Sequence, residues 1–161
     1  MRPAIIVHGG AWDIPAEYHE AHKAGCRQAA LAGFEILANG GSALEAIEAA
    51  NIILENDPTF DAGTGSHLNR AGVVQLDAGV MDGATLQVGA VAAIERVKNP
   101  IVVARMLLDS DHNMFVGSGA TEWAKQKGIT LVDPAELVVD REQHVYERSL
   151  KEIGFDWREA A

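Results

Sequence analysis

The chain has 161 residues, of which 48% are hydrophobic, so its length and composition suit one globular domain with a buried core. Its 23 acidic and 13 basic side chains give a formal net charge of −10, which argues against binding to nucleic acids or to anionic membrane surfaces. The single cysteine, Cys26, cannot form an internal disulfide, and no apolar run has the length of a signal peptide or a transmembrane helix. We therefore expect a cytoplasmic protein in a reducing compartment.

The N-terminal part of the chain is predicted to form one strand and two helices. The apolar run Ala4–Val7 has the length and composition of a buried strand. A helix is expected over about residues 16–38, because small and apolar side chains recur there at helical spacing. Ser42 and Glu45 have the spacing of a capping box, which predicts that a second helix begins there and runs to about Leu54.

The rest of the chain is predicted to mix short strands with helices. An Asp-Gly pair at residues 82–83 separates two apolar runs and indicates a β-hairpin. The expected strands are Val73–Leu76, Gly79–Met81, Leu86–Ile94 and Met114–Val116, and the expected helices are Pro100–Leu108, Glu122–Lys127 and Asp140–Ile153. About five strands and five helices, without regular strand–helix–strand alternation, predict an α+β fold in a single domain. Residues 154–161 are expected to form a loosely ordered tail.

Several glycine-rich motifs carry more information in their order than each does alone. They are His8–Ala11, Asn39–Ala43, Pro58–Gly65, Leu76–Gly83, Gly89–Ala92 and Asn99–Ile101, followed by Ala104-Arg105. In this order they resemble the plant-type asparaginases, also called isoaspartyl peptidases, which are N-terminal-nucleophile (Ntn) hydrolases. The mature enzymes of that family consist of an α and a β subunit cut from one precursor. The resemblance covers nearly the whole chain and concerns the α subunit only.

This resemblance implies a fold and a partner. The fold is a four-layer αββα sandwich, of which residues 1–161 would supply one part of a single domain. Sheet edges and one apolar face would then be left for a second chain to cover. The implied partner is a β subunit from the same precursor, in an (αβ)₂ heterotetramer formed after autoproteolytic cleavage.

The resemblance also places residues near an active site. His8, Gly9 and Gly10 would form a loop beside the nucleophile, since adjacent glycines let the backbone approach a neighbouring group closely. From the residues alone, a tight turn between a strand and a helix is the simpler interpretation. His8 is expected to orient its neighbours through a hydrogen bond rather than to act as a general base. Asp61 stands where many relatives have asparagine, and its carboxylate can alter the pKa of a nearby amine.

A structural sodium ion is a further implication of the resemblance. Main-chain oxygens would bind it, because carbonyl oxygens suit hard cations. From the residues alone, a helix end and a turn without an ion is the simpler interpretation, and no organic cofactor is expected. The matching positions are Leu54, Glu55, Asp57, Phe60, Ala62 and Thr64.

Three other groups of residues receive less weight as sites. Asp77 and Asp82 could form an acid–base pair, but a spacing of five in an extended chain points them to opposite faces. His19 and His22 have the spacing of a helical metal pair, yet a solvated helix face is the favoured interpretation. The segment Gly117–Gly119 is interpreted as a strand-to-helix turn rather than an anion site.

The expected reaction is the hydrolysis of a side-chain amide of aspartate, in asparagine or in β-aspartyl dipeptides. The Ntn mechanism needs a threonine at a chain N-terminus, whose hydroxyl attacks while its own amine acts as the base. This chain begins with Met1, so the β subunit is expected to supply the threonine, and no catalytic residue is expected here. The alternatives are a related Ntn amidohydrolase, such as a glycosylasparaginase or a threonine aspartase, and a non-catalytic scaffold or binding module.

Overall fold

The computed structural model describes residues 2–153, and the tail expected over residues 154–161 lies outside them. In chain order the elements are η1 Ala16–Tyr18, α1 His19–Ala38, α2 Ala43–Asn56, β1 Leu76–Met81, β2 Val88–Ile94, α3 Pro100–Leu107, β3 Met114–Val116, α4 Gly117–Gln126, η2 Pro134–Leu137 and α5 Asp140–Ile153. This mixture of helices and one small sheet agrees with the expected α+β class. Within residues 2–153, no helix is long and apolar enough to cross a membrane.

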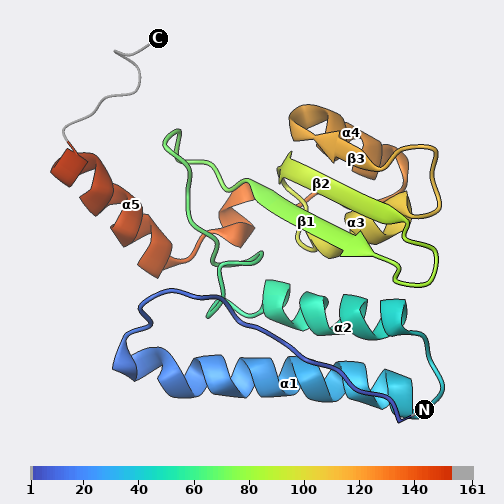
Figure 1. Cartoon of the computed structure of the whole chain (residues 1–161). Coiled ribbons are helices and arrows are strands. Elements are labelled where there is room, and N and C mark those ends of the chain that lie inside the picture. Colours follow the sequence, from blue (N-terminus) through green and yellow to red (C-terminus); the bar gives the residue numbers. More distant parts are fainter. Residues whose placement is uncertain (1, 154–161) are drawn as a thin grey trace.

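Helices α1 and α2 lie side by side, with α2 between α1 and the sheet (Figure 1). The predicted capping box is confirmed: Ser42 Oγ accepts the Glu45 N–H, and the Glu45 carboxylate accepts the Ser42 N–H at 2.7 Å. Buried Ala29 and Ala50, together with Phe60 beyond the end of α2, form the core between the two helices. This pair of helices supports the loops described below.

The sheet has the strand order β1-β2-β3. Strands β1 and β2 form the predicted antiparallel hairpin, and β3 adds to β2 in parallel. Helices α3 and α4 pack on one face of this sheet, where Val91 and Ile94 are buried against Leu107 and Ala124. The side chains that alternate with these buried ones point to the opposite face, as strand geometry requires.

That opposite face of the sheet, called the outward face below, is apolar and exposed. On β1 and β2 its side chains are small or hydrophobic except for Asp77, and Met81, Met114 and Val116 are each more than half exposed. A contiguous exposed apolar surface of this kind is typical of a contact with another layer. Figure 1 shows no helix of residues 2–153 lying over it.

Two expectations about the strands are wrong. The sheet of residues 2–153 has three strands rather than about five, because Val73–Leu76 and Gly79–Met81 are largely replaced by the single strand β1, preceded by an isolated bridge between Leu68 and Val74. The predicted strand Ala4–Val7 has no strand partner among the described residues, and Ile6 is 95% exposed. An apolar run becomes a strand only where a neighbouring strand accepts its backbone hydrogen bonds, and none lies beside this run.

Helix boundaries differ less from expectation. Helix α4 begins at Gly117, five residues before the predicted start, because it follows β3 directly. The predicted long helix over residues 16–38 begins with a 3-10 turn, Ala16–Tyr18, before α1. Strand β3 and helix α5 have the predicted bounds.

Candidate active site

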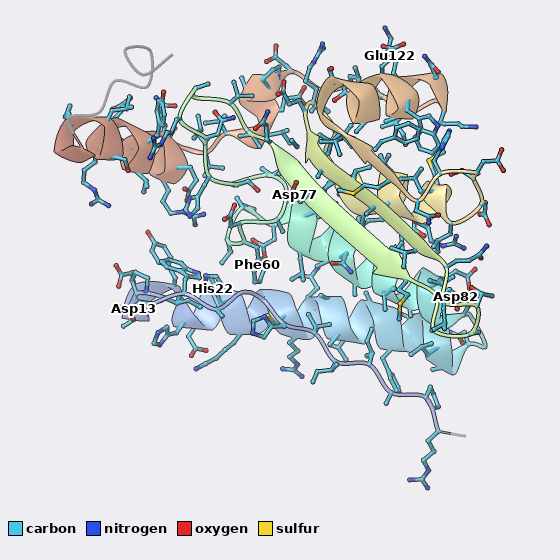
Figure 2. All side chains as sticks on the ribbon, turned by 45° about the horizontal axis from the view of Figure 1, so that its top comes forward. Asp13, His22, Phe60, Asp77, Asp82 and Glu122 are labelled. Carbon is cyan, nitrogen blue, oxygen red and sulfur yellow. The ribbon has the colours of Figure 1, made fainter. Side chains whose placement is uncertain are left out.

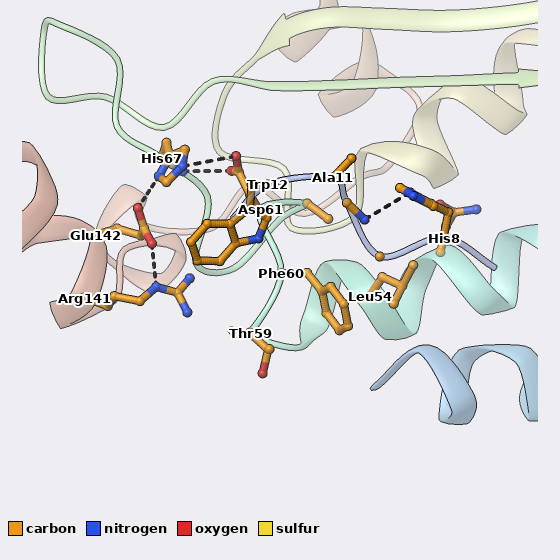
Figure 3. A pocket seen from close by; sticks show the side chains of 14 residues that line it. His8, Ala11, Trp12, Leu54, Thr59, Phe60, Asp61, His67, Arg141 and Glu142 are labelled. Carbon is orange, nitrogen blue, oxygen red and sulfur yellow. Dashed lines mark hydrogen bonds and ion pairs between the residues drawn. The ribbon is translucent and has the colours of Figure 1, made fainter. Parts of the chain in front are cut away.

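A cavity of about 440 Å³ opens where four segments meet: the N-terminal segment, the end of α2, the loop that follows it and the start of α5 (Figure 3). All four residues that the sequence placed near an active site, namely His8, Gly9, Gly10 and Asp61, line it. The remaining lining residues are Ala11, Trp12, Asn51, Leu54, Thr59, Phe60, Ala62, His67, Arg141 and Glu142.

The double glycine on one wall of the cavity is required by its surroundings. A Cβ on Gly9 would lie 2.5 Å from Cys26 Sγ and 2.7 Å from the Phe60 ring, so the backbone passes closer to α1 than a side chain allows. Gly10 has a φ of +105°, which favours glycine. The Gly10 N–H donates to His8 Nδ1 at 3.2 Å, the type of orienting bond expected for this histidine.

The loop after α2 closes on itself. The Thr64 N–H donates to the Glu55 carbonyl at 2.8 Å and joins the two ends of the loop. A Cβ on Gly63 would lie 2.5 Å from that same carbonyl oxygen. Gly65 has a φ of +90°, and a Cβ there would lie 2.6 Å from the Pro58 carbonyl oxygen. This closure brings all six positions expected to bind sodium into one compact turn of the chain.

The donor set of this loop fits a hard monovalent cation. The carbonyls of Leu54, Glu55 and Asp57 each accept one backbone N–H, at 3.3, 2.8 and 3.1 Å. A carbonyl oxygen has two lone pairs, so each can still bind an ion. Among the described residues, no cluster of three or more His, Cys, Asp and Glu side chains could hold a metal. Any ion here would therefore depend on main-chain oxygens.

A buried carboxylate fixes the loop to the next helix. Glu55 is 4% exposed, and its two oxygens accept the Ile101 N–H at 2.9 Å and the Asn99 amide at 3.0 Å. Burial raises the pKa of Glu55 to about 7, and the bonds from Ile101 and Asn99 act in the opposite direction. The side chain thus satisfies a backbone donor in the first turn of α3, which otherwise lacks an intrahelical acceptor.

Asp61 is held by a histidine six residues further along the chain. Asp61 Oδ1 accepts the His67 backbone N–H at 2.9 Å, and His67 Nε2 lies 3.7 Å from Asp61 Oδ2. The other ring nitrogen, Nδ1, hydrogen-bonds Glu142 Oε2 on α5. The His67 ring therefore stands between two carboxylates that come from different parts of the fold, as Figure 3 shows.

Glu142 is a buried charge with partners on both oxygens. It is 3% exposed, and Arg141 Nε donates to its Oε1 at 2.6 Å. Arg141 also lies near the Gly65 carbonyl, with Nη2 at 3.4 Å, and over the Tyr18 ring at 5.9 Å. A buried carboxylate without partners would be costly, so this pairing fixes the start of α5 beside the cavity.

The prediction of a solvated helix face is wrong for His22. His19 is exposed, but His22 is 6% exposed and lies between the Trp12 and Phe60 rings, with ring centroids 6.0 and 5.1 Å away. Figure 2 labels His22 and Phe60. Neither of its ring nitrogens has a hydrogen-bond partner among the described residues. The segments that cover His22 approach α1 from outside it, so helical spacing within α1 could not reveal its burial.

Asp77 and Asp82 do not form an acid–base pair, and the sequence had argued against such a pair. They lie at opposite ends of β1 (Figure 2). Asp77 accepts the Ala93 N–H at 2.7 Å beside an irregularity in the β1–β2 register. Asp82 accepts the Ala84 N–H and the Thr85 hydroxyl in the hairpin turn, and these bonds lower the pKa of Asp82.

Cys26 is partly buried and packs against the core between α1 and α2. Burial, with a smaller contribution from Asp57, raises the pKa of its thiol. A reactive cysteine needs the opposite shift. The segment Gly117–Gly119 forms the start of α4 directly after β3, which agrees with the predicted strand-to-helix turn.

Sequence reasoning missed five residues of the cavity wall: Trp12, Asn51, His67, Arg141 and Glu142. His67 lies two residues after the Pro58–Gly65 motif. A histidine so close to that loop can donate or accept hydrogen bonds, and this could have marked it as a candidate site residue. Arg141 and Glu142 gave none, because 75 residues separate Glu142 from His67 and nothing in the sequence pairs them.

Comparison with known proteins agrees with the motif series. The profile of the asparaginase family matches residues 1–156. The chain belongs to the asparaginase family. Relatives include an isoaspartyl peptidase/L-asparaginase of Xenopus laevis, 44% identical over 94% of this chain and 50% of the relative, and one of Homo sapiens, 39% identical over 96% and 51%. A plant-type L-asparaginase of Pyrococcus abyssi is 49% identical over 81% of this chain and 43% of the relative.

The resemblance inferred from the motifs is therefore confirmed at the level of the family. The chain spans about half the length of the curated relatives it matches. About half the length of each of these relatives thus lies outside the match.

Proposed function

We propose that this asparaginase-family chain is the α subunit of an isoaspartyl peptidase/L-asparaginase. The enzyme would hydrolyse β-aspartyl dipeptides and asparagine through a threonine at the N-terminus of a β subunit. The observation that carries the proposal is the cavity of about 440 Å³, where His8, Gly9 and Gly10 of one motif meet Asp61 of another. The names of the relatives supply the reaction class.

In this mechanism the threonine hydroxyl attacks the side-chain amide carbonyl of the substrate while the threonine amine accepts the hydroxyl proton. The amine then returns the proton to the leaving nitrogen, which departs as ammonia from asparagine or as the α-amine of the second amino acid from a β-aspartyl dipeptide. Water hydrolyses the resulting aspartyl ester and regenerates the hydroxyl. The chain described here would shape the site: Gly9 and Gly10 allow a close approach, and Asp61 sets the charge near the amine.

A sodium ion is proposed to stabilise the loop that carries Asp61. The loop ends are already joined by the bond from Thr64 to Glu55, and the six expected carbonyls lie on this one segment. The ion would hold Asp61 in place from the side remote from the chemistry. It would take no part in the reaction.

The second chain is proposed to cover the outward face and complete a four-layer αββα sandwich. The exposed side chains of Met81, Val88, Met114 and Val116 support a contact with another sheet. The unpaired run Ala4–Val7 is available as a strand for the same partner, since Ile6 is exposed while Ile5 and Val7 pack on the helices. We propose an (αβ)₂ assembly on the basis of the same family resemblance.

The test is a hydrolysis assay on the whole protein, with this chain and its C-terminal continuation expressed together. β-Aspartyl-leucine, asparagine and a glycosylasparagine are offered separately. We expect release of leucine from the dipeptide and ammonia from asparagine, with little turnover of the glycosylated substrate. Turnover of the glycosylated substrate alone would favour a glycosylasparaginase, and no turnover of any of them would favour a scaffold.

A further inference from the structure

The cavity contains a chain of paired side chains of which the proposed reaction uses only Asp61. It runs from Asp61 through His67 to Glu142 and Arg141, and is called the Asp61–Arg141 relay below. Its links are the His67 N–H to Asp61 Oδ1 bond at 2.9 Å, the Nε2–Oδ2 approach at 3.7 Å, the bond from His67 Nδ1 to Glu142, and the Arg141–Glu142 bond at 2.6 Å.

The burial of the relay differs between its two ends. Asp61 and His67 are more than half exposed to the cavity, whereas Glu142 is 3% exposed. A carboxylate so deeply buried keeps its position because breaking its bonds would leave an unpaired charge. The fixed end of the relay is thus in α5, and the end that can respond to it is the carboxylate in the cavity.

The His67 ring links the two ends of the relay, because its two nitrogens face Glu142 and Asp61. An ionised carboxylate only accepts hydrogen bonds, and a neutral imidazole donates from one nitrogen, whereas a protonated one donates from both. With a carboxylate near each nitrogen, the ring cannot turn without losing a partner. Rotation of Asp61 is limited in the same way, since its Oδ1 is held by the His67 backbone N–H and its Oδ2 faces the ring.

We propose that His67 is a positioning residue for Asp61, and that Glu142 of α5 holds His67 in place. The proposal rests on the proposed function for its catalytic consequence only. His67 does not touch the reacting atoms; it fixes the direction of the carboxylate that faces the threonine amine. The relay also couples the position of α5 to the geometry of the cavity, 75 residues away in sequence.

The test uses the whole protein with His67→Leu and His67→Gln, and with His144→Leu as a matched control. His144 lies on α5 two residues after Glu142, is exposed and is not part of the cavity wall. For β-aspartyl-leucine we expect His67→Leu to lower kcat about tenfold, the order expected for a displaced rather than a deleted group. KM should change less than about twofold, His67→Gln should recover part of the loss by keeping one donor, and the control should match wild type.

A double-mutant cycle decides whether His67 acts through Asp61. If it does, adding His67→Leu to Asp61→Asn changes kcat by less than about twofold, because the orientation of position 61 no longer matters. Independent effects that multiply would overturn the proposal, as would wild-type kcat in His67→Leu. If His67→Leu does not mature, the same cycle is run with Glu142→Gln, with the same expected and contrary results.

Failure of the relay can be told from failure of the proposed function. If wild-type protein hydrolyses none of the substrates, the function fails, and the relay is then tested by unfolding. The free energies of unfolding of Asp61→Asn and Glu142→Gln should be coupled in the wild-type background and additive when His67 is leucine. Additivity in both backgrounds would overturn the relay irrespective of activity.

Discussion

The cavity and the outward face differ in how far their side chains find partners within the described residues. Around the cavity, polar groups find partners inside the described residues: His8 binds Gly10, Asp61 binds His67, and Glu142 binds Arg141. On the outward face, hydrophobic side chains such as Met114 and Val116 remain more than half exposed. The comparison indicates that the chain shapes its part of a site with its own residues, whereas its outward face stays uncovered among the described residues.

The largest expected effect comes from leaving the outward face uncovered. Residues 1–161 expressed alone should aggregate or lack a cooperative unfolding transition, because the outward face and the unpaired run Ala4–Val7 stay exposed. The whole protein should show a sharp transition under the same conditions, followed by circular dichroism. A sharp, reversible transition of the isolated chain would break the comparison, since the outward face would then need no partner.

A smaller but still large effect is expected in the closed loop. Gly65→Val places a β-branched residue at a φ of +90° and 2.6 Å from a carbonyl oxygen, and Gly63→Val meets the Glu55 carbonyl at 2.5 Å. Each should cost about 3 kcal/mol or more of stability, together with most of the activity. The physical reason at Gly63 is the close backbone approach, since no left-handed φ is found there.

The matched control for the loop is Gly83→Val in the β1–β2 turn, where a Cβ would have open space. Melting temperature and turnover of the whole protein are the measurements, with and without sodium. Equal behaviour of the loop variants and the control would contradict a tightly closed loop. If wild type melts at the same temperature in sodium and in a large organic cation, the proposed sodium ion is contradicted but the closed loop is not.

Position 61 should affect the reaction more than the fold. Asp61→Leu removes hydrogen bonding from a half-exposed side chain, and should slow maturation or turnover at least about tenfold. Asp61→Asn should retain measurable hydrolysis. A carboxylate favours the protonated form of a nearby amine, so its removal lowers the pKa of that amine and shifts the acidic limb of the pH–rate profile to lower pH. Wild-type maturation, rate and profile in both variants would place Asp61 outside the site.

The smallest effect is expected at His22. Both ring nitrogens are buried and have no hydrogen-bond partner within residues 2–153, so His22→Phe replaces an unsatisfied polar ring by an apolar one of similar shape. We expect the free energy of unfolding of the whole protein to stay equal or to rise by up to about 1 kcal/mol. A loss above about 1 kcal/mol would mean that the imidazole has a polar partner in the assembled enzyme.

Local signals in the sequence predicted much of the fold. The Ser42–Glu45 capping box, the Asp82 turn and strand β3 appear as expected, because each depends on residues only a few positions apart. The run Ala4–Val7 was predicted as a strand from its apolar residues, but pairing depends on a neighbour that local pattern cannot supply. His22 was misjudged for the same reason, since Trp12 and Phe60 cover it from outside its helix.

The residues of the candidate site also fall into those that local motifs predict and those that only the fold brings together. Motifs led to His8, Gly9, Gly10 and Asp61, which all line one cavity. Glu142 and His67 are 75 residues apart, and only folding brings them together. The roles of the motif residues and of the sodium loop remain predictions, because they depend on groups outside this chain.

The central claim is that this chain works with a second chain that begins with threonine. Intact-mass measurement of the purified whole protein, followed by N-terminal sequencing, tests it most directly. The account predicts two chains after maturation, one of them with threonine as its first residue, and their loss when that threonine is replaced by alanine. A single uncut chain with full hydrolytic activity would contradict it.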